Sequence, residues 1–235
     1  MNLTLDIGNS HIKAALFDAD GRMVAHYGHL EHSSPADWPL EQIDAAIVSA
    51  SGVLPDLTRW LPAGVTAHLL TAASPLPIHL DYETPQTLGP DRIAAACGAW
   101  QLYPHSNVLV IDAGTCVTID YIDRTGLFHG GAILPGMAMR FEALHTFTDK
   151  LPLIEYDGAA VADTDPCGRN TRQAILAGVV RGLHYEIAGF VDYYRSRYEQ
   201  VQVVYTGGMP TLPEPQEPHL VLVGLNAILG QIERN

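Results

Sequence analysis

One structural unit occurs twice in this chain, and this repetition limits the folds that the chain can adopt. Each copy is an apolar strand that ends in an aspartate, a glycine two residues later, a second strand, a polar turn and a third strand. The copies span residues 3–30 and 108–134, and Asp6 of the first matches Asp112 of the second. Because an internal repeat is a sign of a duplicated architecture, the sequence predicts two similar α/β halves, residues 1–104 and 105–235.

The remaining segments predict helices and further strands. Apolar runs favour strands over residues 43–50, 66–70 and 201–210, whereas residues 72–88, rich in proline and threonine, are typical of a loop. We expect helices over residues 53–61, 90–103 and 171–198. The last segment, 218–232, is predicted to begin with a short strand and to end in a helix.

An Asp-x-Gly turn between two strands presents backbone N–H groups that a ligand can reach. Glycine permits positive φ and a close approach of the ligand, and successive N–H groups form a concavity that binds anions. The aspartate would repel a phosphate unless a cation lies between them, so two such turns predict a polyphosphate bound together with a metal ion. A single turn of this kind is also typical of an ordinary hairpin. Ligand binding is favoured because the turn occurs twice, each time at the end of an apolar strand.

Composition argues against several classes of function. The net charge is −13, with 13 lysines and arginines and no basic run, which argues against nucleic-acid binding. No window approaches about 18 uninterrupted apolar residues, and the N-terminus lacks the pattern of a signal peptide, so we expect no membrane association. The three cysteines, Cys97, Cys116 and Cys167, cannot all pair within one chain, which favours a reduced, cytoplasmic protein.

The motifs resemble those of a known group of enzymes. "DIGNS", "DAGT" and "TGG" resemble the phosphate 1, phosphate 2 and adenosine motifs of the actin, sugar kinase and Hsp70-like superfamily. The resemblance narrows to type III pantothenate kinases, the bacterial enzymes that begin coenzyme A synthesis, through these further residues: Tyr82, "LGPDR" at 88–92, "GGAILPG" at 130–136 and "NT" at 170–171. It implies a duplicated ribonuclease H-like (actin-like ATPase) fold with ATP in the cleft between two similar halves.

The resemblance also implies a reaction, the transfer of a phosphoryl group from ATP to the primary hydroxyl of pantothenate. Asp91 would be the base, and it lies in the first turn of a predicted helix, where the helix dipole favours its ionised form. Arg92 suits the substrate carboxylate, because its guanidinium can bind bidentately. The full set of implied substrate contacts is Tyr82, Gly89, Pro90, Asp91, Arg92 and Thr171.

Contacts to ATP are implied at two places. They are Asp6, Ile7, Gly8, Asn9, Ser10, His11, Ile12 and Lys13 in the first turn and Thr115 in the second. Asp6 would act with Mg²⁺, directly or indirectly, and Asp112 would bind a monovalent cation, K⁺ or NH₄⁺. The resemblance further implies a homodimer.

Plainer interpretations remain open for several of these residues. Asp91 could be a helix-start carboxylate, Arg92 a surface ion pair, and Asn170 with Thr171 a helix N-cap. His26, His29 and His32 have a spacing that would suit a metal site on a helix, but they fall on a predicted strand and its exit. Two rival functions also remain: another small-molecule kinase or phosphatase of the superfamily, and a non-catalytic regulatory homologue.

Overall fold

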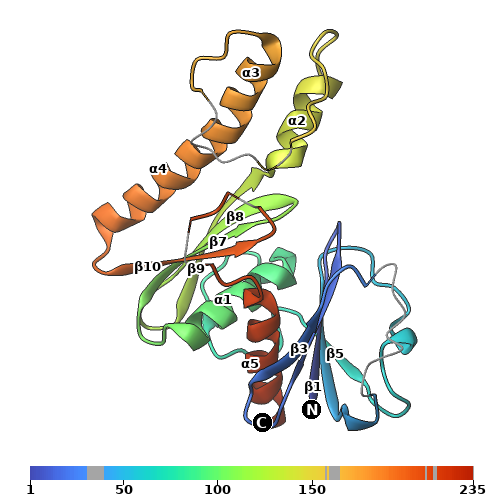
Figure 1. Ribbon diagram of the computed structural model, residues 1–235. Helices are drawn as coiled ribbons and strands as arrows, with labels where there is room; N and C mark the ends of the chain where they lie inside the picture. Colours follow the sequence, from blue (N-terminus) through green and yellow to red (C-terminus); the bar gives the residue numbers. More distant parts are fainter. Residues whose placement is uncertain (31–39, 157, 159–164, 210, 214–215, 235) are drawn as a thin grey trace. The chain divides into compact units, whose positions relative to one another are not determined.

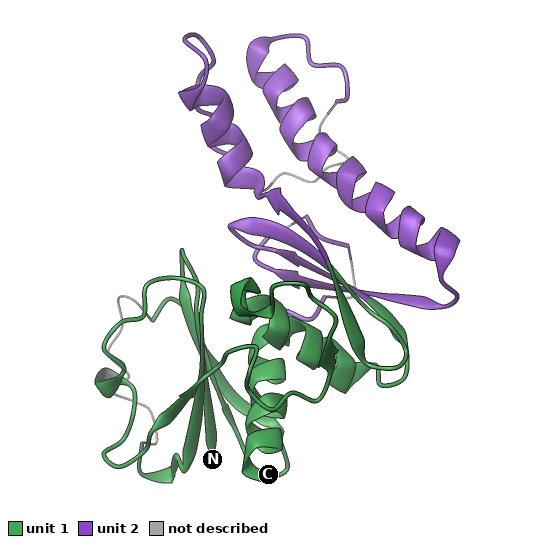
Figure 2. Ribbon diagram, turned by 180° about the vertical axis from the view of Figure 1, so that it is seen from behind, with its two compact units in different colours: residues 1–108, 120–130, 219–235 green, residues 109–119, 131–218 purple. Residues whose placement is uncertain are grey.

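The computed structural model describes residues 1–30, 40–156, 158, 165–209, 211–213 and 216–234. The chain forms two compact units, one of residues 1–108, 120–130 and 219–235, and the other of residues 109–119 and 131–218 (Figure 2). We call them unit 1 and unit 2. These units do not follow chain order, because the C-terminal helix packs with the N-terminal strands. The division into residues 1–104 and 105–235, which follows the repeat, stays a prediction.

The first sheet lies entirely in unit 1. Its strands are β1 (Asn2–Ile7), β2 (Ile12–Phe17), β3 (Met23–Tyr27), β4 (Ala45–Ala50) and β5 (Ala67–Leu69), in the order β3-β2-β1-β4-β5 (Figure 1). β1, β2 and β3 form an antiparallel meander. β4 is parallel to β1, and β5 is parallel to β4.

The second sheet repeats this arrangement. Its strands are β6 (His79–Leu80), β7 (Asn107–Ala113), β8 (Cys116–Ile122), β9 (Leu127–Pro135) and β10 (Val201–Gly207), in the order β10-β7-β8-β9-β6. The run β10-β7-β8-β9 corresponds to β4-β1-β2-β3, so the predicted duplication is confirmed and extends to a fourth strand. β6, which is parallel to β9, has no counterpart at that edge of the first sheet.

Two helices pack together in unit 1. α1 (Pro90–Leu102) lies against α5 (Leu220–Arg234), and α5 also contacts β1, β2 and β4 (Figure 1). Glycines make the close approach of the two helices possible, because a Cβ on Gly98 would overlap the backbone of Leu220 and a Cβ on Gly224 would overlap that of Ala94. An apolar cluster of unit 1 includes Leu3, Leu5, Val48 and the fully buried Trp60. Because side chains alternate along a strand, Leu3 and Leu5 point to the face of the sheet opposite that of Asp6.

Unit 2 has a long helical rod beside a shorter helix (Figure 1). The rod consists of α3 (Thr171–Leu176), a π-helical segment (Ala177–Arg181) and α4 (Gly182–Arg197), and the shorter helix is α2 (Met137–Thr146). A cluster of five buried residues joins them: Phe141, Ile154, Ile175, Val179 and Val180. Arg140 on α2 forms a bidentate ion pair with Glu186 on α4, with N–O distances of 3.0 and 2.6 Å.

The helices at 90–103 and 171–198 are confirmed, but other local predictions were wrong. Residues 53–61 form only a 3₁₀ turn, Leu57–Arg59, and residues 72–88 contain β6 and a second such turn, Pro85–Thr87. A third 3₁₀ turn is Leu40–Gln42. The strand expected near residue 218 is instead the start of α5, because a short apolar run cannot be assigned to strand or buried helix by periodicity. α2 was not predicted.

The rod from Thr171 to Arg197 is, among the described residues, the one helix long and apolar enough to cross a membrane by length and composition. One third of its most apolar window, 33%, is buried within the structure. A soluble protein's helix that packs against other protein surfaces meets the same criteria, so this observation alone does not indicate a membrane span.

We predict that Gly224→Ala will lower the free energy of unfolding by at least about 2 kcal/mol, because the added methyl overlaps the carbonyl of Ala94 and must force α1 and α5 apart. Gly230→Ala, on the same helix, is the matched control. Its Cβ would meet only the end of the Arg234 side chain, so it should stabilise the protein slightly through helix propensity. Urea unfolding of both variants checks this, and equal stabilities would contradict it.

Candidate active site

Asp6 is the acidic residue of β1 and lies between polar residues on the two neighbouring strands. In register, Asp6 is opposite Lys13 on β2 and beside Ser49 on β4. Paired residues of neighbouring strands point to the same face, so the three side chains share one face. Oδ1 of Asp6 and Oγ of Ser49 are buried and make no hydrogen bond of normal geometry among the described residues.

The surroundings of Asp6 disfavour a negative charge. Burial and the negative charge of Asp91 raise the pKa of Asp6 from 3.8 to about 6, while the charge of Lys13 and the hydroxyl of Ser49 oppose the rise. A buried carboxylate oxygen without a hydrogen-bond donor is costly. A bound cation would supply the missing partner, so the residues fit the Mg²⁺ that accompanies ATP.

Mg²⁺ is usually held by one or two carboxylates together with substrate phosphates and water, rather than by a cage of protein ligands. Within the described residues, no three His, Cys, Asp or Glu side chains gather to form such a cage. Asp6, with Asp91 near enough to act on it electrostatically, therefore suits an ion that is brought in with the nucleotide.

The turn after Asp6 is closed by backbone hydrogen bonds. The N–H of Gly8 donates to the carbonyl of His11 at 3.0 Å, and Asn9, Ser10 and His11 form the exposed tip of the turn. The carbonyl of Ile7 accepts two N–H groups from the end of β4, those of Ser51 at 3.0 Å and Gly52 at 3.1 Å. A Cβ on Gly52 would lie 2.6 Å from the carbonyl oxygen of Gly8, so glycine is required there.

The turn after Asp112, in unit 2, has the same construction. The N–H of Gly114 donates to the carbonyl of Cys116 at 2.9 Å. The carbonyl of Ala113 accepts the N–H groups of Gly208 at 3.0 Å and Met209 at 3.2 Å, which follow the end of β10. The duplication therefore extends to individual hydrogen bonds.

Glycines bring backbone segments against this second turn. Gly207 lies against the backbone of Ala113. Its φ is +103°, a backbone conformation that residues with a Cβ rarely adopt. Gly136, the N-cap residue of α2, donates its N–H to the carbonyl of Thr115, and a Cβ there would overlap the same carbonyl. Thr115 itself is exposed at the tip of the turn, and Asp112 is half-buried.

The candidate base lies at the start of α1. Gly89 is the N-cap residue, Pro90 and Asp91 begin the helix, and Asp91 is half-buried. Oδ1 of Asp91 accepts the backbone N–H of Arg92 at 3.0 Å. Its charge raises the pKa of Asp6, so the carboxylates of Asp6 and Asp91 belong to one site.

Arg92 is buried and forms an ion pair with Asp120 on β8. Nε of Arg92 donates to Oδ2 of Asp120 at 3.0 Å, and Nη2 donates to Oδ1. Burial would lower the pKa of Arg92, but the hydrogen bonds and charge of Asp120 outweigh it and raise that pKa. The guanidinium carbon also lies 5.8 Å from the centre of the Tyr82 ring. The expected role of Arg92 as a clamp for a substrate carboxylate stays a prediction, since two of its donors are already engaged.

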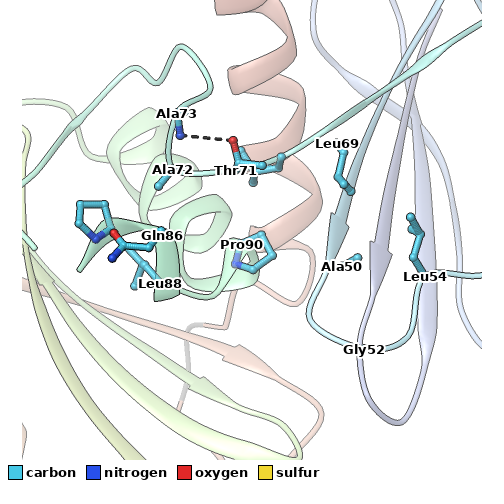
Figure 3. Close-up of a pocket in the computed structure, with 12 residues that line it drawn as sticks. Ala50, Gly52, Leu54, Leu69, Thr71, Ala72, Ala73, Gln86, Leu88 and Pro90 are labelled. Carbon is cyan, nitrogen blue, oxygen red and sulfur yellow. Dashed lines mark hydrogen bonds between the residues drawn. The ribbon is translucent and has the colours of Figure 1, made fainter.

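A cavity of about 690 Å³ lies in unit 1 between the first turn and the start of α1 (Figure 3). It extends from Gly52, beside the first turn, to Pro90 at the start of α1. Most of its lining is apolar, and Thr71 and Gln86 supply polar side chains; the other lining residues are Ala50, Leu54, Leu69, Leu70, Ala72, Ala73, Pro85 and Leu88. Such a space suits a small organic molecule that has both apolar and hydrogen-bonding groups.

The remaining predicted site residue is Thr171, in unit 2. It is the first residue of α3 and is exposed, and Asn170 before it caps the helix by accepting the N–H of Gln173 at 2.9 Å. The plain N-cap interpretation is therefore correct for Asn170, while a substrate contact of Thr171 stays a prediction.

The structure gathers most of the predicted residues in unit 1: the turn of residues 6–13, Tyr82, and residues 89–92. Asp112, Thr115 and Thr171 lie in unit 2. Sequence reasoning gave no role to Ser49 or Asp120, although each is a polar residue inside an apolar strand, which is a usable signal. His26 lies on β3 and its ring is 4.2 Å from that of His219. His29 follows β3, and His32 lies outside the described residues.

Comparison with known proteins decides between the enzymes that this arrangement could represent. The sequence matches the type III pantothenate kinase family over residues 2–193. The chain belongs to the type III pantothenate kinase family. It is 40% identical to the type III pantothenate kinase of Phocaeicola vulgatus, with 98% of each chain covered, and 39% identical to that of Cytophaga hutchinsonii, with 98% and 99% covered.

Solved structures with lower identity share the fold. A conserved putative Baf family transcriptional activator from Campylobacter jejuni has a TM-score of 0.62 at 19% identity, covering 99% of this chain and all of that one. A putative 2-dehydro-3-deoxygalactonokinase from Sinorhizobium meliloti has a TM-score of 0.60 at 14% identity, with 99% of each covered. The predicted duplicated actin-like fold is confirmed.

We predict that Asp6 makes the stability of the nucleotide-free protein depend on pH. Because its pKa is raised in the folded state, the carboxyl is protonated below about pH 4 in both the folded and the unfolded protein and does not affect stability there. As the pH rises from about 4 to about 6, ionisation favours the unfolded state and lowers the free energy of unfolding. Asp6→Asn should therefore be more stable than the wild type at pH 7.5, by up to about 3 kcal/mol, and equally stable below pH 4.

Urea unfolding at a series of pH values without Mg²⁺ measures this difference. Asp20→Asn, at an exposed carboxylate of the β2–β3 turn, is the control and should show no such trend. A difference between Asp6→Asn and the wild type that does not change with pH would contradict the prediction.

Proposed function

We propose that this chain transfers the γ-phosphoryl group of ATP to the primary hydroxyl of pantothenate, the first step of coenzyme A synthesis. The observation that carries the proposal is the joint placement, in unit 1, of two carboxylates. Oδ1 of Asp6 is buried and suits a cation, and Asp91 follows Pro90, which lines a largely apolar cavity. Family membership identifies the acceptor, because relatives at 40% and 39% identity are named type III pantothenate kinase.

The first turn is suited to the phosphates of ATP. Its tip is exposed, the glycine at its start leaves the backbone accessible, and Lys13 supplies a positive charge beside Asp6. Asp6 would hold Mg²⁺, directly or through water, and the ion would neutralise charge on the phosphates during transfer. In this proposal Thr115 also contacts ATP.

The cavity in unit 1 offers room for pantothenate. It is adjacent both to the first turn, through Gly52, and to Asp91, through Pro90. Its apolar lining suits the branched carbon skeleton of the substrate, and Thr71 and Gln86 can hydrogen-bond its amide. Asp91 would orient the acceptor hydroxyl and take its proton, for which a weak base suffices when the transition state is loose.

We predict that Asp91→Asn will lower kcat by about 10²–10⁴-fold, the usual contribution of a general base. KM for ATP should change less than about twofold, because Asp91 lies on the acceptor side and not in an Asp-x-Gly turn. Glu83→Gln, at an exposed carboxylate near the same helix start, is the control and should keep wild-type kcat. A near-normal kcat for Asp91→Asn with pantothenate would return Asp91 to the role of a helix-start carboxylate.

Activation by a monovalent cation is proposed at Asp112. The half-buried carboxylate of Asp112 and the hydroxyl of Thr115 in the adjoining turn offer oxygen atoms, the kind of ligand that a hard cation such as K⁺ would take. Asp112→Asn should raise the K⁺ or NH₄⁺ concentration needed for half-maximal activity at least about tenfold, with Mg²⁺ dependence unchanged. Full wild-type activity in buffer with neither K⁺ nor NH₄⁺ would show that no such cation is required.

A homodimer is proposed from the surface of unit 2. Large apolar side chains are exposed there on and around α2 and α4, including Ile133 at 63%, Phe147 at 84% and Tyr185 at 63% of their full area. Burial of such side chains against a second copy of the chain would remove their apolar area from water. Light scattering at micromolar concentration should give twice the chain mass of 25.5 kDa, and the monomer mass would exclude the dimer. A cytoplasmic location stays a prediction.

A further inference from the structure

The pair of Arg92 and Asp120 is unusual within the described residues, because both partners are charged and nearly inaccessible. Arg92 is 7% exposed and Asp120 is 2% exposed, while the other buried polar side chains, Thr4, Ser49 and Thr206, are uncharged. Two hydrogen bonds join the guanidinium to the two oxygens of the carboxylate. The pair joins the first turn of α1 to the middle of β8.

Stability does not explain this pair well. Removing two charges from water costs about as much as their attraction returns, and an apolar pair of similar volume is often as stable or more so. A buried ion pair does have one property that an apolar pair lacks, which is direction. It holds one residue at a defined angle, as a bidentate contact allows little rotation.

The neighbours of the pair belong to the candidate site. Arg92 directly follows Asp91, and its guanidinium lies against the ring of Tyr82. The ring of Tyr82 in turn packs on Gly130, where an added Cβ would lie 3.0 Å from it. The charge of Asp91 acts on Asp120 as well as on Asp6, raising the pKa of each.

We propose that Asp120 is a positioning residue for the reaction: by holding Arg92, it fixes the first turn of α1 and thereby the place of the neighbouring Asp91. Asp91 is then held in one position relative to the acceptor hydroxyl. This inference rests on the proposed function, in which Asp91 is the base. Asp120 touches no reacting group itself and acts through Arg92.

The test is Asp120→Asn, which keeps the size of the side chain and removes its charge. We expect kcat for pantothenate to fall about 10- to 100-fold, as misplacement of a reacting group by about 1 Å does, with KM for ATP within about twofold of the wild type. The split between kcat and KM is the deciding readout, because a displaced base lowers kcat per folded enzyme while KM for ATP stays the same. A purely structural role would reduce the amount of folded enzyme and leave kcat per folded enzyme unchanged.

Asp123→Asn is the matched control, an equal change three residues further along the chain. Asp123 pairs with His129 and with the backbone of its own turn, not with Arg92, so kcat and both KM values should stay as in the wild type. Asp120→Asn with kcat per folded enzyme within twofold of the wild type would overturn the inference. Absence of pantothenate turnover in the wild type would instead overturn the proposed function.

If Asp120→Asn does not fold, the double variant Arg92→Met with Asp120→Leu supplies a folded protein with an apolar pair of similar volume. We expect it to bind Mg·ATP with wild-type affinity by calorimetry and to have lost at least about 10-fold in kcat. Wild-type turnover by this variant would show that the pair has no positioning role.

Discussion

The two Asp-x-Gly turns of this protein are held by the same kind of backbone contact. In each turn the carbonyl of the residue between aspartate and glycine accepts two N–H groups from the chain that follows the fourth strand of its repeat. A carbonyl that accepts two hydrogen bonds is held firmly, and the glycine N–H of each turn closes the turn by donating to a carbonyl within it. The rest of each turn can be small and exposed because its base is fixed by the sheet. The glycines at 52, 136 and 207 are needed because backbone segments approach these turns too closely for a side chain.

Asp6 shows how function and stability oppose each other at this site. A carboxylate with one buried oxygen that lacks a hydrogen bond, and with a second acid nearby, is unfavourable in the nucleotide-free protein. The same features make it a good partner for a cation that arrives with a polyphosphate. Lys13 and Ser49 reduce the energetic cost of the Asp6 charge without removing it. Binding of the metal–nucleotide complex should therefore remove much of the remaining cost.

Much of the fold could be predicted from the sequence, because the repeated Asp-x-Gly unit is local and has a clear period. The meander of each half and the helix that begins at Pro90 follow from strand alternation, turn residues and a proline at the helix start. α5 was partly misassigned because its start, "LVLV", is apolar on every side, as a buried helix and a buried strand both are. The units were not predictable from chain order, since they depend on glycine contacts between α1 and α5 that no local pattern encodes.

The candidate site was predicted in its residue types and less completely in its contacts. Asp6, Asp91 and the first turn were identified from motif resemblance, and the structure brings them together in unit 1. The engagement of Arg92 by Asp120 could not be predicted, because pairing between residues 28 positions apart depends on how α1 packs near β8. A charged residue within the apolar run "VTIDYI" was the only sequence sign of it.

The identity of the acceptor distinguishes a pantothenate kinase from other small-molecule kinases of the same fold. A coupled ADP-release assay on the wild-type enzyme with Mg·ATP and K⁺ can compare pantothenate with a panel of sugars and with acetate at equal concentrations. We expect ADP release that depends on pantothenate and yields one phosphorylated product, with no release above background for the other acceptors. Equal or greater turnover of a sugar, or ATP hydrolysis that does not respond to pantothenate, would contradict it.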